Sequence, residues 1–69
     1  MSVEQREEIL RHVKKLGEEA KIAVRGIRQQ ARKQIETSGR GSLHAVQEAT
    51  DVAVEEIEQL VNAKVAELT

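Results

Sequence analysis

Residues 9–35, ILRHVKKLGEEAKIAVRGIRQQARKQI, decide the fold of this chain. Apolar side chains recur there at intervals of three or four residues, at Ile9, Val13, Leu16, Ala20, Val24, Ile27, Ala31 and Ile35. This spacing places them on one face of an α-helix. Because the chain contains no proline, the pattern predicts one continuous helix of about eight turns.

The residues on either side of this stretch carry the signals that begin and end helices. Ser2, followed three residues later by Gln5, has the form of a capping box, and it predicts a helix start at Val3. In the run TSGRGS, residues 37–42, Gly39 suits a left-handed C-cap and Ser42 suits the next N-cap. A second apolar face follows at Leu43, Val46, Thr50, Ala53, Ile57, Leu60, Val61 and Leu68.

We therefore predict an all-α fold with a single domain over residues 1–69, an antiparallel hairpin of two long helices. Helix one should span about residues 3–37, the turn about 38–42, and helix two about 43–68. Two helices do not enclose a core, and apolar burial barely offsets chain entropy in domains this small. We expect dimerisation or a partner protein to complete a three- or four-helix bundle.

The distribution of charge and the residue types that are absent indicate the class of protein. Residues 1–37 hold nine of the eleven Lys and Arg residues against six Glu, whereas residues 38–69 hold two against six acidic residues. The chain has no cysteine, no aromatic residue, no apolar signal segment and no run approaching a membrane span. A cytoplasmic protein without a membrane role is the expectation.

Nothing in the sequence has the pattern of a catalytic or metal site. His12 and His44 are far apart, and neither has a second ligand at metal-binding spacing. The serines are accounted for by caps and the turn, and no glycine-rich phosphate loop follows a strand. We expect a protein that is not an enzyme, with no cofactor, no metal and no small-molecule substrate.

The most informative charged feature is a basic stripe formed by Lys21, Arg25, Arg28 and Arg32. At about 100° per residue their spacing of four, three and four keeps them within roughly 60° of one another. No acidic residue lies between Glu19 and Glu36. One interpretation is a contact surface for a nucleic-acid backbone. The other is a solvated face whose late cations favour the helix C-terminus.

Helix two carries an acidic row on a face away from its apolar residues, formed by Glu48, Asp51, Glu55 and Glu58. It either keeps the protein in solution or pairs with a basic stripe, for example that of a second copy. Two glycines, Gly17 and Gly26, interrupt helix one at a cost of about 1 kcal/mol each. Gly26 would allow a close backbone approach or a bend, or it has no structural role.

Two segments, KKLGEEAKIAVRGIRQQARKQI and VQEATDVAVEEIEQLVNAKVAEL, resemble the ribosome recycling factor family. In that family an N-terminal helix leads into a small β domain, and two long helices complete a three-helix bundle. The chain looks like those last two helices with a shortened turn. The resemblance covers nearly its whole length and is most specific around AKIAVRGIR.

The resemblance implies which residues meet RNA. The family's arginine-rich segment faces large-subunit ribosomal RNA, and the positions that carry over are Arg25 and Arg28, with Lys21 as a lesser candidate. The chain departs from the family pattern at Gly26, Gln29 and Gln30, and Arg32 adds a charge. The family's β domain and first helix are absent from this sequence.

Two hypotheses of different class follow. In the first, the protein docks on ribosomal RNA of the large subunit through Arg25, Arg28, Lys21 and Arg32, without full recycling activity. In the second, it is a homodimeric four-helix-bundle module for assembly with no role in RNA binding.

Overall fold

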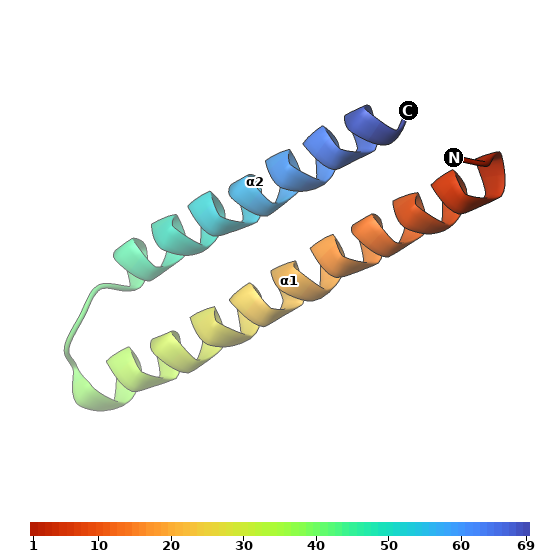
Figure 1. Ribbon diagram of the computed structural model, residues 1–69. Coiled ribbons are helices and arrows are strands. Elements are labelled where there is room, and N and C mark those ends of the chain that lie inside the picture. The colour runs from red at the N-terminus through yellow and green to blue at the C-terminus, as the bar shows by residue number, and fades with distance from the viewer.

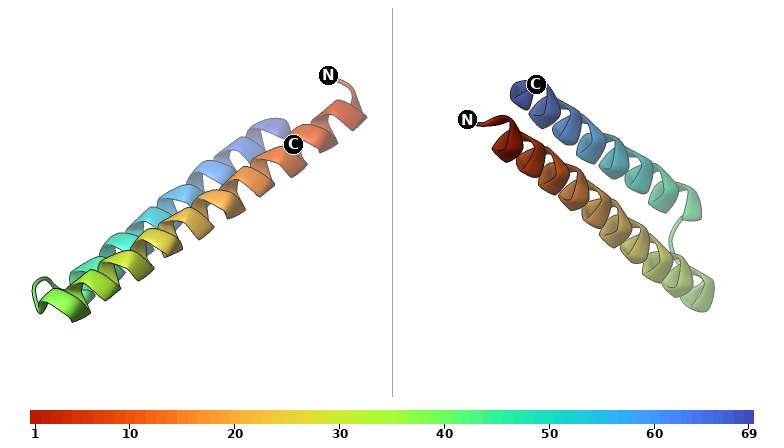
Figure 2. Two further views of the ribbon diagram at one scale, coloured as in Figure 1. Left: turned by 90° about the horizontal axis from the view of Figure 1, so that it is seen from below. Right: turned by 90° about the vertical axis from the view of Figure 1, so that its right-hand side faces the viewer.

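The computed structural model describes residues 1–69 as two α-helices joined by a short turn, with no strand. Helix α1 spans Val3–Ser38 and helix α2 spans Leu43–Leu68. The helices lie side by side and antiparallel in all three ribbon views (Figures 1 and 2), and the molecule extends 55 × 15 × 8 Å. The predicted all-α hairpin is confirmed.

Local hydrogen bonds define the helix ends. Gln5 N donates to Ser2 Oγ and Ser2 N donates to Gln5 Oε1, both at 3.1 Å, so the predicted capping box is present. At the other end of α1, Gly39 adopts the left-handed conformation with φ 70° and donates from its N–H to Ile35 O. Ser42 Oγ accepts from Ala45 N at the start of α2. Each cap satisfies a backbone group that the helix itself leaves unpaired.

The two helices approach each other closely at Gly17. This glycine and Thr50 are the two buried residues of the chain. A Cβ atom at Gly17 would lie 2.5 Å from Val61 Cγ2, so the missing side chain allows the close approach. Thr50 Oγ1 donates to Val46 O in its own helix at 2.8 Å, so its hydroxyl is not left unpaired.

The hairpin has no enclosed hydrophobic core, because none of its apolar side chains is buried. Residues of the contact line between the helices, such as Val13, Val24 and Ile57, are only half-buried. Other members of the predicted apolar faces remain in solvent: Leu16 is 50% exposed, Ile27 65% and Leu60 68%. Neither helix contains a stretch long and apolar enough to cross a bilayer.

Candidate nucleic-acid interface

The basic stripe runs along the edge of α1 that borders α2. Its four residues are separated by about one helical turn each, so the side chains follow one another along the helix. The same edge of α2 carries Asp51, Glu55 and Glu58. Basic and acidic side chains therefore face each other across one polar groove, and the four residues of the stripe differ in how far α2 engages them.

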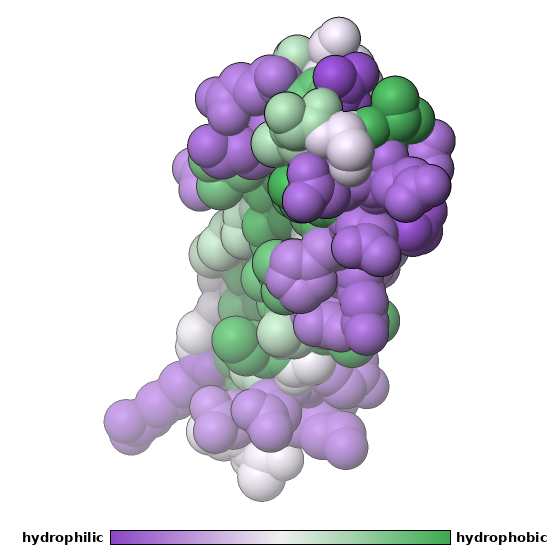
Figure 3. Space-filling model, turned by 45° about the vertical axis from the view of Figure 1, so that its right-hand side comes forward, coloured by the Kyte–Doolittle hydropathy of each residue, from purple (hydrophilic) through white to green (hydrophobic).

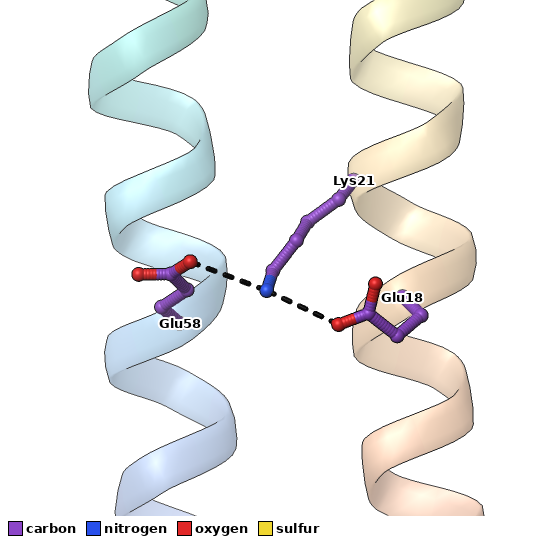
Figure 4. A network of polar contacts seen from close by, with 3 residues as sticks. All are labelled: Glu18, Lys21 and Glu58. Carbon is purple, nitrogen blue, oxygen red and sulfur yellow. Dashed lines mark hydrogen bonds and ion pairs between the residues drawn. The ribbon is translucent and has the colours of Figure 1, made fainter.

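Lys21 is the most strongly engaged of the four (Figure 4). Its Nζ lies 3.2 Å from Glu58 Oε1 on α2 and 3.3 Å from Glu18 Oε1 one turn earlier on α1. Its side chain is only 15% exposed. The hydrogen bond to Glu58, followed by the one to Glu18, raises the pKa of Lys21 above its ordinary value of 10.5. Lys21 therefore joins the two helices as a protonated ammonium group.

Arg28 is held in a chain of polar contacts. Its Nε donates to Gln47 Oε1 at 2.8 Å, and Gln47 Nε2 donates to Asp51 Oδ1 at 2.8 Å. The Arg28 contact is part-buried. Gln47 was not among the predicted site residues, because its place opposite Arg28 depends on the register of the two helices. That register is not visible in the periodicity of either helix alone.

Arg25 and Arg32 are the two members of the stripe without an ion pair or a side-chain hydrogen bond. Arg25 is exposed and lines the polar groove, a hollow of about 380 Å³ that also contains Asp51, Glu55 and Glu58. Arg32 is half-buried near the turn. Arg25 is thus the one exposed cation of the stripe that has no partner for an anionic ligand to displace.

Two residues of the acidic row form ion pairs of different kinds. Glu58 binds Lys21 across the helix interface, whereas Glu48 lies 3.0 Å from His44 one turn earlier in α2. No three His, Asp or Glu side chains gather as a metal site would require. The groove thus carries charged side chains of both signs along one face of the hairpin.

A family model described as ribosome recycling factor matches residues 1–69, the whole chain. The chain belongs to the ribosome recycling factor family. It is 38% identical over 74 residues to a ribosome-recycling factor of Staphylococcus haemolyticus, covering 93% of this chain and 40% of that protein. It is 36% identical over 78 residues to a ribosome-recycling factor of Campylobacter curvus, covering 99% of this chain and 42% of that protein. No solved structure matches the chain.

The chain spans about 40% of the length of the ribosome-recycling factors that it matches. The alignment with the Staphylococcus haemolyticus protein is 74 residues long, although it includes only 93% of this 69-residue chain. That relative therefore has residues within the aligned region that this chain lacks.

Proposed function

We propose that this member of the ribosome recycling factor family docks on ribosomal RNA of the large subunit through the basic stripe, without full recycling activity. Arg25 and Arg28 would carry the binding, supported by Lys21 and Arg32. The protein would act in the cytoplasm as a binding protein, with no chemistry on a substrate. Membership of the family and the order of cations along α1 support this proposal.

The main support for the proposal comes from the surroundings of the Arg25 side chain. Its side chain is exposed and has no partner within the hairpin, so a phosphate group meets no competing contact there. Guanidinium groups bind phosphate oxygens through two parallel hydrogen bonds, which fixes orientation as well as adding affinity. Arg25 would make the first contact, with Arg28 one turn further along the same edge.

Lys21 and Arg28 would exchange or share partners when RNA binds. Lys21 is held by Glu58 and Glu18, and Arg28 is held by Gln47. Each contact must be given up or shared before a phosphate takes its place. Asp51, Glu55 and Glu58 also lie along the same groove and repel phosphate. These acidic residues would keep non-specific affinity low and favour an RNA surface that matches the groove in shape.

Recognition would depend on the backbone and shape of the RNA. The chain contains no Phe, Tyr or Trp, so bases cannot stack on aromatic side chains. Contacts to phosphates position a protein but do not read sequence. Affinity should fall steeply with salt, with a slope near −3 for about four phosphate contacts.

Co-sedimentation with 50S subunits across a salt series tests the proposal. The double variant Arg25→Glu/Arg28→Glu should lose salt-sensitive binding, because two phosphate contacts become repulsive. Arg25→Glu alone should also bind weakly, and this variant breaks no contact within the hairpin. Lys15→Glu/Arg40→Glu makes the same change in net charge away from the stripe, and it should bind as the unchanged protein does.

Two results would contradict the proposal. One is binding by the Arg25→Glu/Arg28→Glu protein equal to that of the unchanged protein at every salt concentration. The other is an equal loss of binding in the Lys15→Glu/Arg40→Glu control, which would show that net charge rather than the stripe governs association. Circular dichroism of each variant confirms that helix content is retained.

A further inference from the structure

Gln47 lies between two charged side chains that leave its amide group a single orientation. Arg28 Nε donates to Gln47 Oε1 at 2.8 Å, and Gln47 Nε2 donates to Asp51 Oδ1 at 2.8 Å. A guanidinium group can only donate hydrogen bonds, and an ionised carboxylate can only accept them. The amide must therefore turn its oxygen toward Arg28 and its nitrogen toward Asp51. Both ends of the Gln47 amide are fixed in this way.

The contact with Gln47 uses only part of the hydrogen-bonding capacity of Arg28. An arginine side chain carries N–H groups on Nε and on both Nη atoms. Gln47 binds the Nε–H, and neither Nη atom of Arg28 takes part in a side-chain hydrogen bond or an ion pair within the hairpin. The two Nη atoms form the end of the guanidinium fork, which can bind two phosphate oxygens at once. This fork stays available while Nε remains bound to Gln47.

Arg28 lies at the border between polar and apolar surroundings. It is half-buried, and besides the polar groove it borders a shallow hollow of about 340 Å³ that is lined mainly by apolar side chains of both helices. Figure 3 shows hydrophobic residues running along the molecule between hydrophilic margins. At such a border the methylene groups of an arginine pack on apolar neighbours, and its charged group turns to polar ones. Arg28 therefore has less freedom before binding than Arg25, which is exposed and has no side-chain partner.

We propose that Gln47 is a positioning residue for the RNA contact, a role that rests on the proposed function of the basic stripe. Gln47 holds Arg28 by Nε, and the two Nη atoms then present a preformed fork to one phosphate group of the RNA backbone. Ordering a long side chain during binding costs free energy, and a side chain ordered beforehand avoids that cost. Arg25 supplies the freely reachable cation, and Arg28 supplies the oriented one.

The uncharged amide of Gln47 suits it to this role better than a carboxylate would. Lys21 is held by two carboxylates, those of Glu58 and Glu18, and these compete with phosphate for the same ammonium group. Gln47 orients the guanidinium without neutralising it and without repelling phosphate. It also binds the Asp51 carboxylate, and no ion pair joins Asp51 to Arg28. The positive charge of Arg28 is thereby kept for a ligand.

Co-sedimentation with 50S subunits across a salt series tests the role of Gln47. Gln47→Met keeps the length and helix propensity of the side chain but removes both amide groups. Binding should weaken by about 2- to 10-fold, the range expected when one side chain is no longer ordered in advance. The slope of affinity against salt should not change, because no charge is altered. Gln59→Met makes the same substitution at an exposed position of α2 outside the polar groove, and it should bind as the unchanged protein does.

The same substitution in a second background separates positioning from other roles. Arg28→Lys keeps the positive charge but has no guanidinium fork to orient. Adding Gln47→Met to Arg28→Lys should therefore cause no further loss of binding. An equal loss in both backgrounds would overturn the inference, because it would show that Gln47 contacts RNA itself or supports the hairpin in general. Stronger binding by Gln47→Met would also overturn it, by showing that Gln47 competes with RNA for Arg28.

The contact between Gln47 and Arg28 can be observed in the free protein. In nitrogen–proton correlation spectra, the Nε–H of Arg28 should exchange with water more slowly than that of Arg25, which has no partner. Gln47→Met should remove this difference, and Gln59→Met should preserve it. Equal exchange of the two arginines in the unchanged protein would mean that Gln47 does not hold Arg28 in solution, and the inference would fail.

Failure of this inference and failure of the proposed function give different results. If the unchanged protein does not bind 50S subunits, or if Arg25→Glu/Arg28→Glu binds as well as it does, the proposed function fails and Gln47 has no phosphate contact to prepare. If binding depends on the stripe but Gln47→Met binds as Gln59→Met does, only the positioning role fails.

Discussion

Gly17 and Gly26 lie in the same helix in opposite surroundings. A side chain at Gly17 would meet Val61, whereas a Cβ atom at Gly26 would have nothing within 4 Å. Only Gly17 therefore serves a close approach of helices, and no contact in the hairpin explains Gly26. From the sequence, Gly26 was the candidate for a close backbone approach because it lies within the basic stretch. The close contact between the helices is instead at Gly17.

The two glycines give a matched pair of substitutions. Gly26→Ala should raise the free energy of unfolding by up to about 1 kcal/mol, because alanine is the better helix former. Gly17→Ala gains the same propensity but forces the new methyl group against Val61, whose χ1 angle is stiff. Overpacking typically costs about 1–3 kcal/mol, so a net loss of stability is expected. Urea unfolding followed by circular dichroism, at one protein concentration, measures both changes.

Shortening the opposing side chain provides the control. Adding Val61→Ala to Gly17→Ala should recover part of the lost stability, since the contact that forces the helices apart is removed. Equal stabilisation by Gly17→Ala and Gly26→Ala would contradict the close packing of the two helices at Gly17.

Between the two helices, the ion pair of Lys21 with Glu58 makes stability depend on pH. The pKa of Lys21 is raised in the folded state, first by Glu58 and then by Glu18. A raised lysine pKa contributes stability that is fully present below its ordinary value of 10.5. This contribution is lost as the pH rises through the higher folded-state value. The thermal midpoint of the unchanged protein should therefore fall in this alkaline range.

The variant Glu58→Gln should reduce the alkaline decline, because the main cause of the raised pKa is removed. Glu18→Gln removes the contact within α1 and should have a smaller effect. Thermal unfolding from neutral to alkaline pH, followed by circular dichroism, compares the three proteins. Identical profiles for the unchanged protein and Glu58→Gln would show that this ion pair does not act in solution.

The two helices and their antiparallel arrangement were predictable because the signals for them are local. Intervals of three and four residues, the cap at Ser2 and the glycine at position 39 each act within a few residues. The contacts across the polar groove were not predictable in the same way. Lys21 meets Glu58, and Arg28 meets Gln47, in the register that also places Gly17 beside Val61. No pattern within either helix encodes that alignment.

At the scale of the whole molecule, the hairpin keeps its basic stripe apart from its exposed apolar side chains. Arg25 and Ile27 are two residues apart, which turns them about 200° around α1. The polar groove and Ile27, which is 65% exposed, therefore lie on opposite sides of α1.

The unequal length of the helices has a consequence for local stability. Helix α1 has 36 residues and α2 has 26, so the first turns of α1 extend past the end of α2 (Figure 1). Residues 3–9 are all exposed there. Their amide hydrogens should exchange with deuterated water well before those around Gly17, since they open by fraying alone. Among the basic residues that lie within the two helices, Arg6 should likewise be the first after which trypsin cleaves, trimming α1 toward the length over which the two helices support each other.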